Sequence, residues 1–221
     1  MDGSAPVSIG WLAPQAGWLR IRIEQRGISA QAALHAPDAD DTQATSPSPR
    51  AGAFSFVSRA APGSSLQLRV ESQDSATLRG EVCVRVEALS ESSASDRDRI
   101  RAERAFAAAS HEVAQRRWQP ASDRYTEAAR LFDRIGARRD AAWARSAMAE
   151  LAYRRFDREV DARALATSAL AEFGAGEDSL SRGALLTLIG KIASDNSSPD
   201  ARALMNTMAL FAAAQRAFDR T

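Results

Sequence analysis

The hydrophobic pattern of this 221-residue chain changes its period once, near residue 92. Before this point apolar residues alternate with polar ones, as in the run Leu19, Ile21 and Ile23. After it, apolar residues recur every three or four positions. A period of two places alternate side chains on one face of a strand, whereas a period near 3.6 gives a helix one apolar face. The sequence therefore predicts a β region followed by an α region.

Five segments of the β region alternate apolar and polar side chains, and clusters of glycine, serine and proline separate them. Short alternating strands with such turns between them are typical of an antiparallel sandwich. The predicted strands are WLRIRIEQ (18–25), ISAQAALHA (28–36), AFSFV (53–57), SLQLRV (65–70) and EVCVRVEAL (81–89). An edge strand is predicted at 7–13, and the polar segment Asp38–Gly52 is predicted to be an exposed loop. We expect an N-terminal antiparallel β-sandwich domain at residues 1–91.

Glycine and proline become scarce after a serine-rich segment, which predicts a linker at residues 92–98. Ser95 is a suitable N-cap because its hydroxyl can accept a hydrogen bond from an unpaired amide of the first helical turn. Six helices are predicted, at residues 95–116, 120–135, 138–155, 159–173, 178–194 and 199–219. Breaks about every 20 residues are the pattern of stacked helical hairpins. The second predicted domain spans residues 99–221.

Small residues recur in the predicted hairpins at a spacing of 41 positions, as at Ala121 and Ala162. Small side chains let two helices approach closely, and larger neighbours fill the space between them. The predicted repeat-packing residues are Trp118, Ala121, Tyr125, Ala128, Tyr153, Ala162, Ala169 and Gly190. The first four resemble the second-helix pattern of the tetratricopeptide repeat (TPR), whose usual period is about 34 residues. We expect a TPR-like α-helical hairpin array.

The last predicted helix carries a broad apolar stripe, whereas the end of a solenoid normally has a polar outer face. The stripe contains Met205, Met208, Phe211 and Phe218. We predict that this helix is an interface that packs on another copy of the chain, on another protein or on a continuation of the chain. Protein partners and homo-oligomers through this helix are therefore expected.

The residue types that carry most enzyme chemistry are few and scattered. The two histidines, His35 and His111, and the single cysteine, Cys83, lie in different predicted elements and form no motif. A nucleophile needs a base within hydrogen-bond reach, and a metal site needs several ligands at defined spacing. The sequence predicts no catalytic residue, no metal site and no cofactor, and we expect the chain not to be an enzyme.

The charge distribution and the apolar runs limit the expected partners and location. The formal net charge is +1, and no basic stripe with interleaved aromatic residues occurs, which argues against nucleic-acid binding. No segment approaches the ~20 apolar residues that a membrane span needs. The N-terminal residues do not have the pattern of a signal peptide. We therefore expect no nucleic acid partner, no membrane span and a cytoplasmic location.

The segment GWLRIRIEQRGISAQAALHAPD (17–38) resembles the N-terminal β-domain of bacterial caspase-like (CHAT) proteins. In that family a strand ending in Ile-Glu-Gln precedes Arg-Gly-Ile and a strand ending in Pro-Asp. The β-domain is followed there by an arginine-rich start like SDRDRIRAERAF (95–106), by degenerate TPRs and by a caspase-like protease domain. The resemblance covers most of residues 11–173. The catalytic His and Cys of the protease domain have no counterparts here, so the resemblance implies a non-catalytic part.

These observations predict a non-enzymatic protein–protein interaction or regulatory module. The resemblance makes it the sensor or scaffold portion associated with a CHAT caspase-like protease, with that protease or its regulator as partner. The alternative is a carbohydrate- or surface-binding accessory protein that acts through the β-sandwich, with Trp11 and Trp18 as stacking platforms. Trp18 lies opposite the face of Leu19, where it is either exposed or covered by the first strand or the first helix.

Overall fold

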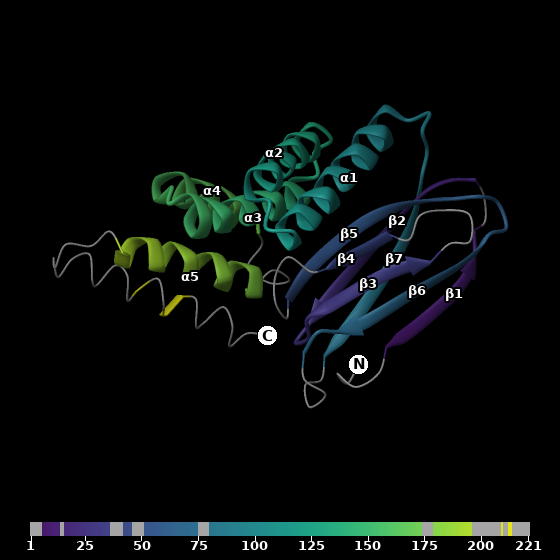
Figure 1. Cartoon of the computed structure of the whole chain (residues 1–221), viewed down its shortest axis with the longest axis horizontal. Coiled ribbons are helices and arrows are strands. Elements are labelled where there is room, and N and C mark those ends of the chain that lie inside the picture. Colours follow the sequence, from purple (N-terminus) through teal and green to yellow (C-terminus); the bar gives the residue numbers. More distant parts are fainter. Residues whose placement is uncertain are drawn as a thin grey trace. The chain divides into compact units, whose positions relative to one another are not determined.

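The structure is a computed structural model that describes residues 6–13, 16–35, 42–45, 51–74, 80–173, 179–195, 209 and 212–213. The chain divides into two compact units, Met1–His111 and Glu112–Thr221. Among the described residues, the strands all belong to the first unit, and helices predominate in the second (Figure 1). The chain therefore has an α+β fold, because its strands and helices are segregated along the sequence.

The first unit contains two antiparallel sheets. Their strands are β1 (Val7–Leu12), β2 (Gly17–Arg26), β3 (Ala30–His35), β4 (Thr42–Thr45), β5 (Ala51–Ala60), β6 (Ser65–Ser72) and β7 (Glu81–Leu89). The strand order is β1-β6-β3-β4 in one sheet and β5-β2-β7 in the other, as can be followed in Figure 1. Both sheets thus combine strands that are distant in sequence.

Six of these strands lie where the alternating pattern predicts them, and β4 does not. The segment Asp38–Gly52 was expected to be an exposed loop, which is wrong for Thr42–Thr45 because these residues pair with β3. It is also wrong for Ala51 and Gly52, which begin β5 and pair with β2. The sequence Thr-Gln-Ala-Thr has no large apolar side chain, so it carries no alternation of hydrophobicity. Backbone hydrogen bonding to a neighbouring strand, which needs no particular side chain, forms this strand.

The apolar faces of the two sheets contribute to a single hydrophobic cluster. Strand β2 is an example. Its residues Leu19, Ile21 and Ile23 are buried on one face, as the alternation predicts. The buried members of the cluster are Ala13, Leu19, Ile21, Ile23, Ala30, Ala32, Leu34, Phe54, Phe56, Ala60, Leu66, Leu68 and Val70. Apart from Ala13, which follows β1, they come from β2 and β5 of one sheet and from β3 and β6 of the other. Burial of these side chains is the main force that holds the unit together.

The opposite face of the β5-β2-β7 sheet packs against helix α1 (Ala94–Ala114). The helix begins after Ser93, whose hydroxyl accepts a hydrogen bond of 3.2 Å from the backbone amide of Asp96. Ser93 and not Ser95 is therefore the N-cap. Ile100 of the helix contacts Val57 and Leu89 of the sheet and forms a second small apolar cluster.

A buried ion pair joins α1 to the centre of this sheet. The Nε of Arg20 on β2 donates to Oε1 of Glu103 at 2.6 Å, and the two residues are only 4% and 1% exposed. The hydroxyl of Ser55 on β5 donates to the same carboxylate at 2.7–2.8 Å. A second carboxylate, that of Glu87 on β7, lies 3.4 Å from Nη1 of Arg20. The helix is thereby bonded directly to β2 and β5, and Arg20 extends the network to β7.

The first helix groups with the sheets, since the first unit extends to His111. The sequence predicted a linker at residues 92–98, but α1 begins inside that segment, at Ala94. The predicted domain limits, 1–91 and 99–221, concern which parts of the chain fold independently, and they remain a prediction. What the contacts establish is that α1 contributes buried side chains to the packing of the β unit.

The second unit is built from helices that pack on one another in succession. They are α2 (Trp118–Arg134), α3 (Arg138–Phe156), α4 (Glu159–Glu172) and α5 (Ser179–Asp195). Their limits differ from the predicted ones by no more than two residues, because glycine, proline and polar breaks mark the helix ends clearly. The sixth predicted helix, 199–219, lies almost entirely outside the described residues.

Gly80, which directly precedes β7, lies so close to other atoms that a side chain cannot be added without displacement. A Cβ at this position would lie 2.7 Å from the Cβ of Ile28, and closer still to the carbonyl oxygen of Arg26. We expect Gly80→Ala to lower the free energy of unfolding by ~1–3 kcal/mol, measured by urea denaturation, because of overpacking.

Gly10 in β1 provides the matched control for Gly80. A Cβ at Gly10 would meet only the carbonyl oxygen of Leu66, at an ordinary 3.8 Å. Gly10→Ala should therefore change the stability by less than about 0.5 kcal/mol. Equal effects of the two substitutions would show that the close approach at Gly80 does not constrain the fold.

Removing the Glu103 carboxylate should destabilise the first unit strongly. Glu103→Ala leaves the buried Arg20 guanidinium without its nearest counter-charge, and such a loss costs about 3–5 kcal/mol. Glu150→Ala on α3 is the control, because Glu150 pairs with Arg154 in an exposed i,i+4 pair, which is worth about 0.5 kcal/mol or less. The double variant Arg20→Met/Glu103→Leu should recover most of the loss. Urea denaturation followed by circular dichroism measures all three, and equal losses for Glu103→Ala and Glu150→Ala would contradict the assignment.

Candidate functional site

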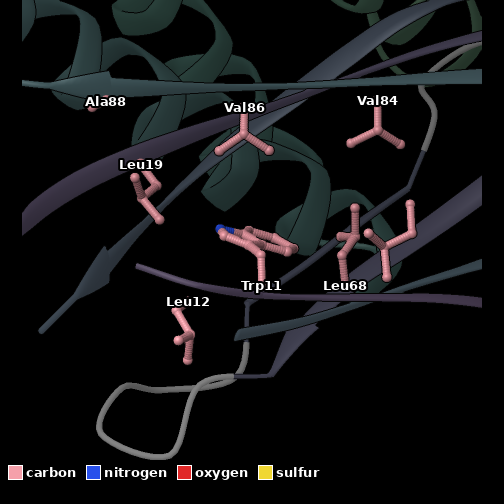
Figure 2. A pocket seen from close by; sticks show the side chains of 8 residues that line it. Trp11, Leu12, Leu19, Leu68, Val84, Val86 and Ala88 are labelled. Carbon is pink, nitrogen blue, oxygen red and sulfur yellow. The ribbon is translucent and has the colours of Figure 1, made fainter. Parts of the chain in front are cut away.

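An apolar groove with a volume of about 600 Å³ opens between the two sheets of the first unit. Its lining comes from both sheets and consists of Ile9, Trp11, Leu12, Leu19, Leu68, Val84, Val86 and Ala88. We call this the β1–β7 groove, since β1 and β7 supply six of these residues. Figure 2 shows Val84 and Val86 pointing from β7 toward the indole ring of Trp11 on β1. All lining side chains are apolar.

The groove exists because β1 and β7 are edge strands. β1 pairs only with β6, and β7 pairs only with β2, among the strands that the structure describes. Side chains at the edge of a sheet have neighbours on one flank only, so the apolar positions of β1 and β7 are less covered than those of the central strands. Their exposure follows: Ile9 and Val86 are each 42% exposed, and Leu12 is 67% exposed.

Exposed apolar side chains concentrate at this place. The large hydrophobic residues that are exposed in the described part of the chain are Val7, Ile9, Leu12, Val86 and Val160. The first four lie on β1 or β7. Isolated exposed hydrophobic residues are common, but a contiguous group beside a groove is typical of an interaction site.

The two tryptophans proposed as stacking platforms occupy different environments. Trp11 is half-buried and forms part of the groove. Trp18 lies on the other face of its sheet, where it packs against the cluster around Ile100 of α1. Its Nε1 donates to a carboxylate oxygen of Glu91 at 2.6 Å, and the guanidinium of Arg104 lies 5.6 Å from its ring centroid. The first helix therefore covers Trp18, and only Trp11 faces the groove.

The residues considered for catalysis or metal binding remain separate from one another and from the groove. His35 lies at the exposed end of β3, and His111 lies in the last turn of α1. Cys83 is an exposed free thiol on the outer face of β7, opposite the groove side. Within the described ranges no group of three or more His, Cys, Asp or Glu residues is placed to hold a metal ion.

The predicted repeat-packing residues mostly lie inside the helical unit. Ala121 and Ala128 of α2 and Ala162 and Ala169 of α4 are fully buried, and Tyr125 is 3% exposed. Gly190 of α5 is also buried. The small side chains allow α2 and α4 to pack closely on α3, which lies between them.

Two of the predicted packing residues are only half-buried, and they make specific polar or cationic contacts. The guanidinium of Arg155 lies 4.3 Å from the ring centroid of Trp118 and links α3 to α2. The hydroxyl of Tyr153 donates a hydrogen bond to Asp195 of α5. This bond to a carboxylate stabilises the protonated phenol and raises the pKa of Tyr153 above its ordinary value of 10.0.

A second groove runs along the surface of α4, and half of its lining residues are polar or charged. It has a volume of about 670 Å³ and is lined by Glu159, Val160, Arg163, Ala164, Thr167, Ser168, Ala171 and Ile192. The predicted interface residues Met205, Met208, Phe211 and Phe218 lie outside the described residues. The β1–β7 groove is therefore the better defined apolar site of the two.

Comparison of the chain with models of known protein families gives no match, and comparison with curated proteins gives no significant match. None of the described helices is both long enough and apolar enough to cross a membrane.

The sequence did not predict the groove. It identified β1 and β7 as strands, but alternation does not reveal which strands lie at sheet edges or which edges from two sheets come together. The sequence contained one indication of the groove, which was the prediction of an edge strand at VSIGWL, before the more strongly alternating strands.

An apolar fluorescent probe should detect the groove in the folded chain. We expect 1-anilinonaphthalene-8-sulfonate to bind there, and Val86→Glu to weaken the binding severalfold because a carboxylate on the groove wall must be desolvated. Val160→Glu on α4 is the matched control, since it places the same charge on an exposed valine elsewhere. Fluorescence titration of the folded variants measures the effect. Equal probe binding by the wild type and Val86→Glu would show that the groove does not accept apolar ligands.

Proposed function

We propose that the chain is a non-enzymatic protein–protein interaction module. In this proposal the first unit is a β-sandwich whose β1–β7 groove binds an extended apolar segment of a partner, and the second unit is a TPR-like array. The single cluster between the two sheets supports the sandwich. Buried alanines at a spacing of 41 residues, such as Ala121 and Ala162, support the repeats.

The observation that carries the proposal is the exposed apolar groove between two sheet edges. Covering Ile9, Leu12 and Val86 removes apolar surface from water, which stabilises a complex by about 25 cal/mol for each Å². Strand β1 beside the groove also has an open edge among the described strands, whose backbone groups can pair with an added strand. A peptide in extended conformation can use both contributions.

We further propose that the partner is a CHAT caspase-like protease or its regulator. The support is the resemblance of residues 17–38 and 95–106 to that family, together with the order of a β unit before packed helices. In this arrangement the chain senses a signal or positions the protease, and the protease domain carries the catalytic His and Cys. The chain contributes binding surfaces on two units and no reacting group.

The alternative function, carbohydrate or surface binding, has weaker support. Stacking of a sugar ring needs an accessible aromatic face and polar groups that bind hydroxyls. Arg104 lies over the ring of Trp18, and the lining of the β1–β7 groove around Trp11 is apolar throughout. Such a lining suits an apolar peptide better than a carbohydrate.

The proposed function can be tested by site-specific photo-crosslinking in the cells that make the protein. A photoreactive phenylalanine derivative replaces Leu12, which borders the groove and is 67% exposed. We expect a light-dependent adduct with a polypeptide that contains a caspase-like His/Cys domain or regulates one, identified by its tryptic peptides. Because Val86 lies on the facing wall, Val86→Glu should reduce the adduct severalfold.

Arg69 gives the control position for this experiment. It lies on β6 of the same sheet as Leu12, but its exposed side chain points away from the groove. An adduct of equal yield from positions 12 and 69 would show that the crosslinking is unspecific. An adduct with a glycan at position 12 would favour the alternative function.

A further inference from the structure

The outer edge of β7 is open in a sheet that is otherwise paired. In the order β5-β2-β7, strand β7 pairs with β2 over Glu81–Leu89 and has no neighbour on its other side among the described strands. The strand order places β7 at this margin of its sheet. The backbone amides and carbonyls along an open edge can form a ladder with another strand.

Two of the charged side chains on the outer face of β7, Glu81 and Arg85, form no ion pair within the described chain, whereas Glu87 pairs with Arg20. Arg85 lies beside Arg22 in the β2–β7 register, and the guanidinium of Arg22 binds Glu24 at 3.2 Å. Arg85 is therefore an exposed cation next to a like charge, with no carboxylate paired to it in the described structure. Glu81, four residues earlier on the same face, is exposed and also forms no ion pair there.

We propose that β7 pairs with β7 of a second copy, antiparallel and about a two-fold axis at Cys83. In this register Cys83 faces Cys83 of the second copy. Glu81 then faces Arg85 of the second copy, and the symmetry forms this pair twice. On the groove side, Val82 faces Val84 of the second copy, and Val86 faces Gly80 of the second copy.

Charge complementarity selects this register. Moving the axis to Val84 places Glu81 opposite Glu87, and moving it to Arg85 places that arginine opposite itself. Opposed like charges destabilise a strand pair, whereas opposite charges stabilise it. A register with the axis at Val86 would pair Arg85 with Glu87, but the Glu87 carboxylate already lies 3.4 Å from the Arg20 guanidinium. The axis at Cys83 uses the two charges that have no partner.

The same register covers apolar surface. It joins two β5-β2-β7 sheets into one continuous sheet, and the valines of both β7 strands then form one apolar face. Val86, which is 42% exposed, comes to lie opposite Gly80 of the second copy, which has no side chain of its own and packs on Ile28. An interface of this kind is isologous, since each copy contributes the same strand. It leaves the partner of the β1–β7 groove undetermined and so goes beyond the proposed function.

The single cysteine makes the register measurable. Residues directly opposite in an antiparallel pair have Cα atoms about 4.5–5.5 Å apart, which is within the range of about 4.4–6.8 Å that a disulfide spans. If the two-fold axis lies one residue away, at Val82 or Val84, the two cysteines are no longer opposite each other, because Cys83 then faces Glu81 or Arg85 of the second copy. A Cys83–Cys83 cross-link is therefore specific for the proposed axis.

The test combines mass measurement with a charge swap on the full chain. In reducing buffer of low ionic strength, light scattering after size exclusion should give twice the 23.8 kDa of one chain. Arg85→Glu and Glu81→Arg should each give the monomer mass, because each places two like-charged pairs across the axis. The double variant Glu81→Arg/Arg85→Glu should restore the dimer. Mild oxidation with diamide should cross-link the wild type and the double variant at least severalfold faster than either single variant.

Arg130→Glu on α2 is the control, since it changes the net charge as Arg85→Glu does, at an exposed site in the second unit. It should leave the mass and the cross-linking rate unchanged, and circular dichroism should show all variants folded. A wild type that stays monomeric at high concentration overturns the proposal. A dimer that persists in both single variants overturns it too, because another surface then forms the interface.

Discussion

The buried ion pair between Arg20 and Glu103 is the interaction on which the arrangement of the first unit depends. A charged pair that is almost fully buried is tolerated only when its remaining donors and acceptors are satisfied, and Ser55 and Glu87 satisfy them here. The pair fixes α1 against the outer face of the β5-β2-β7 sheet. Helix α1 thereby covers the centre of that face, so binding to this sheet is proposed at the groove and at the outer edge of β7.

Both binding surfaces have the same physical origin, which is the incomplete pairing of edge strands. An edge strand exposes apolar side chains on its inner face and backbone groups along its margin. In this chain the inner faces of β1 and β7 form the groove, and the margin of β7 carries unpaired charges of opposite sign. The two surfaces share the side chain of Val86, so a partner that fills the groove and a second copy at the β7 edge both contact it.

Sequence patterns predicted the elements well and the site poorly. Alternation located six strands, and helical periodicity with clear breaks located five helices, because each depends on neighbours in sequence. The strand Thr42–Thr45 was missed, since its side chains carry no pattern and only pairing with β3 forms it. Ser95 was chosen as the helix N-cap over Ser93 because several serines are adjacent, and only the hydrogen bond to Asp96 distinguishes them.

The sequence by itself determined the α+β class, the positions of six strands and five helices and the inner face of those strands, since these follow from local periodicity. It could not determine the sheet order, because strand pairing brings together residues that are distant in sequence, such as β1 with β6. Only the tertiary structure placed β1 and β7 at edges that border one groove, covered Trp18 with α1, and brought Arg20 to Glu103. Those contacts join segments separated by tens of residues, so no local pattern encodes them.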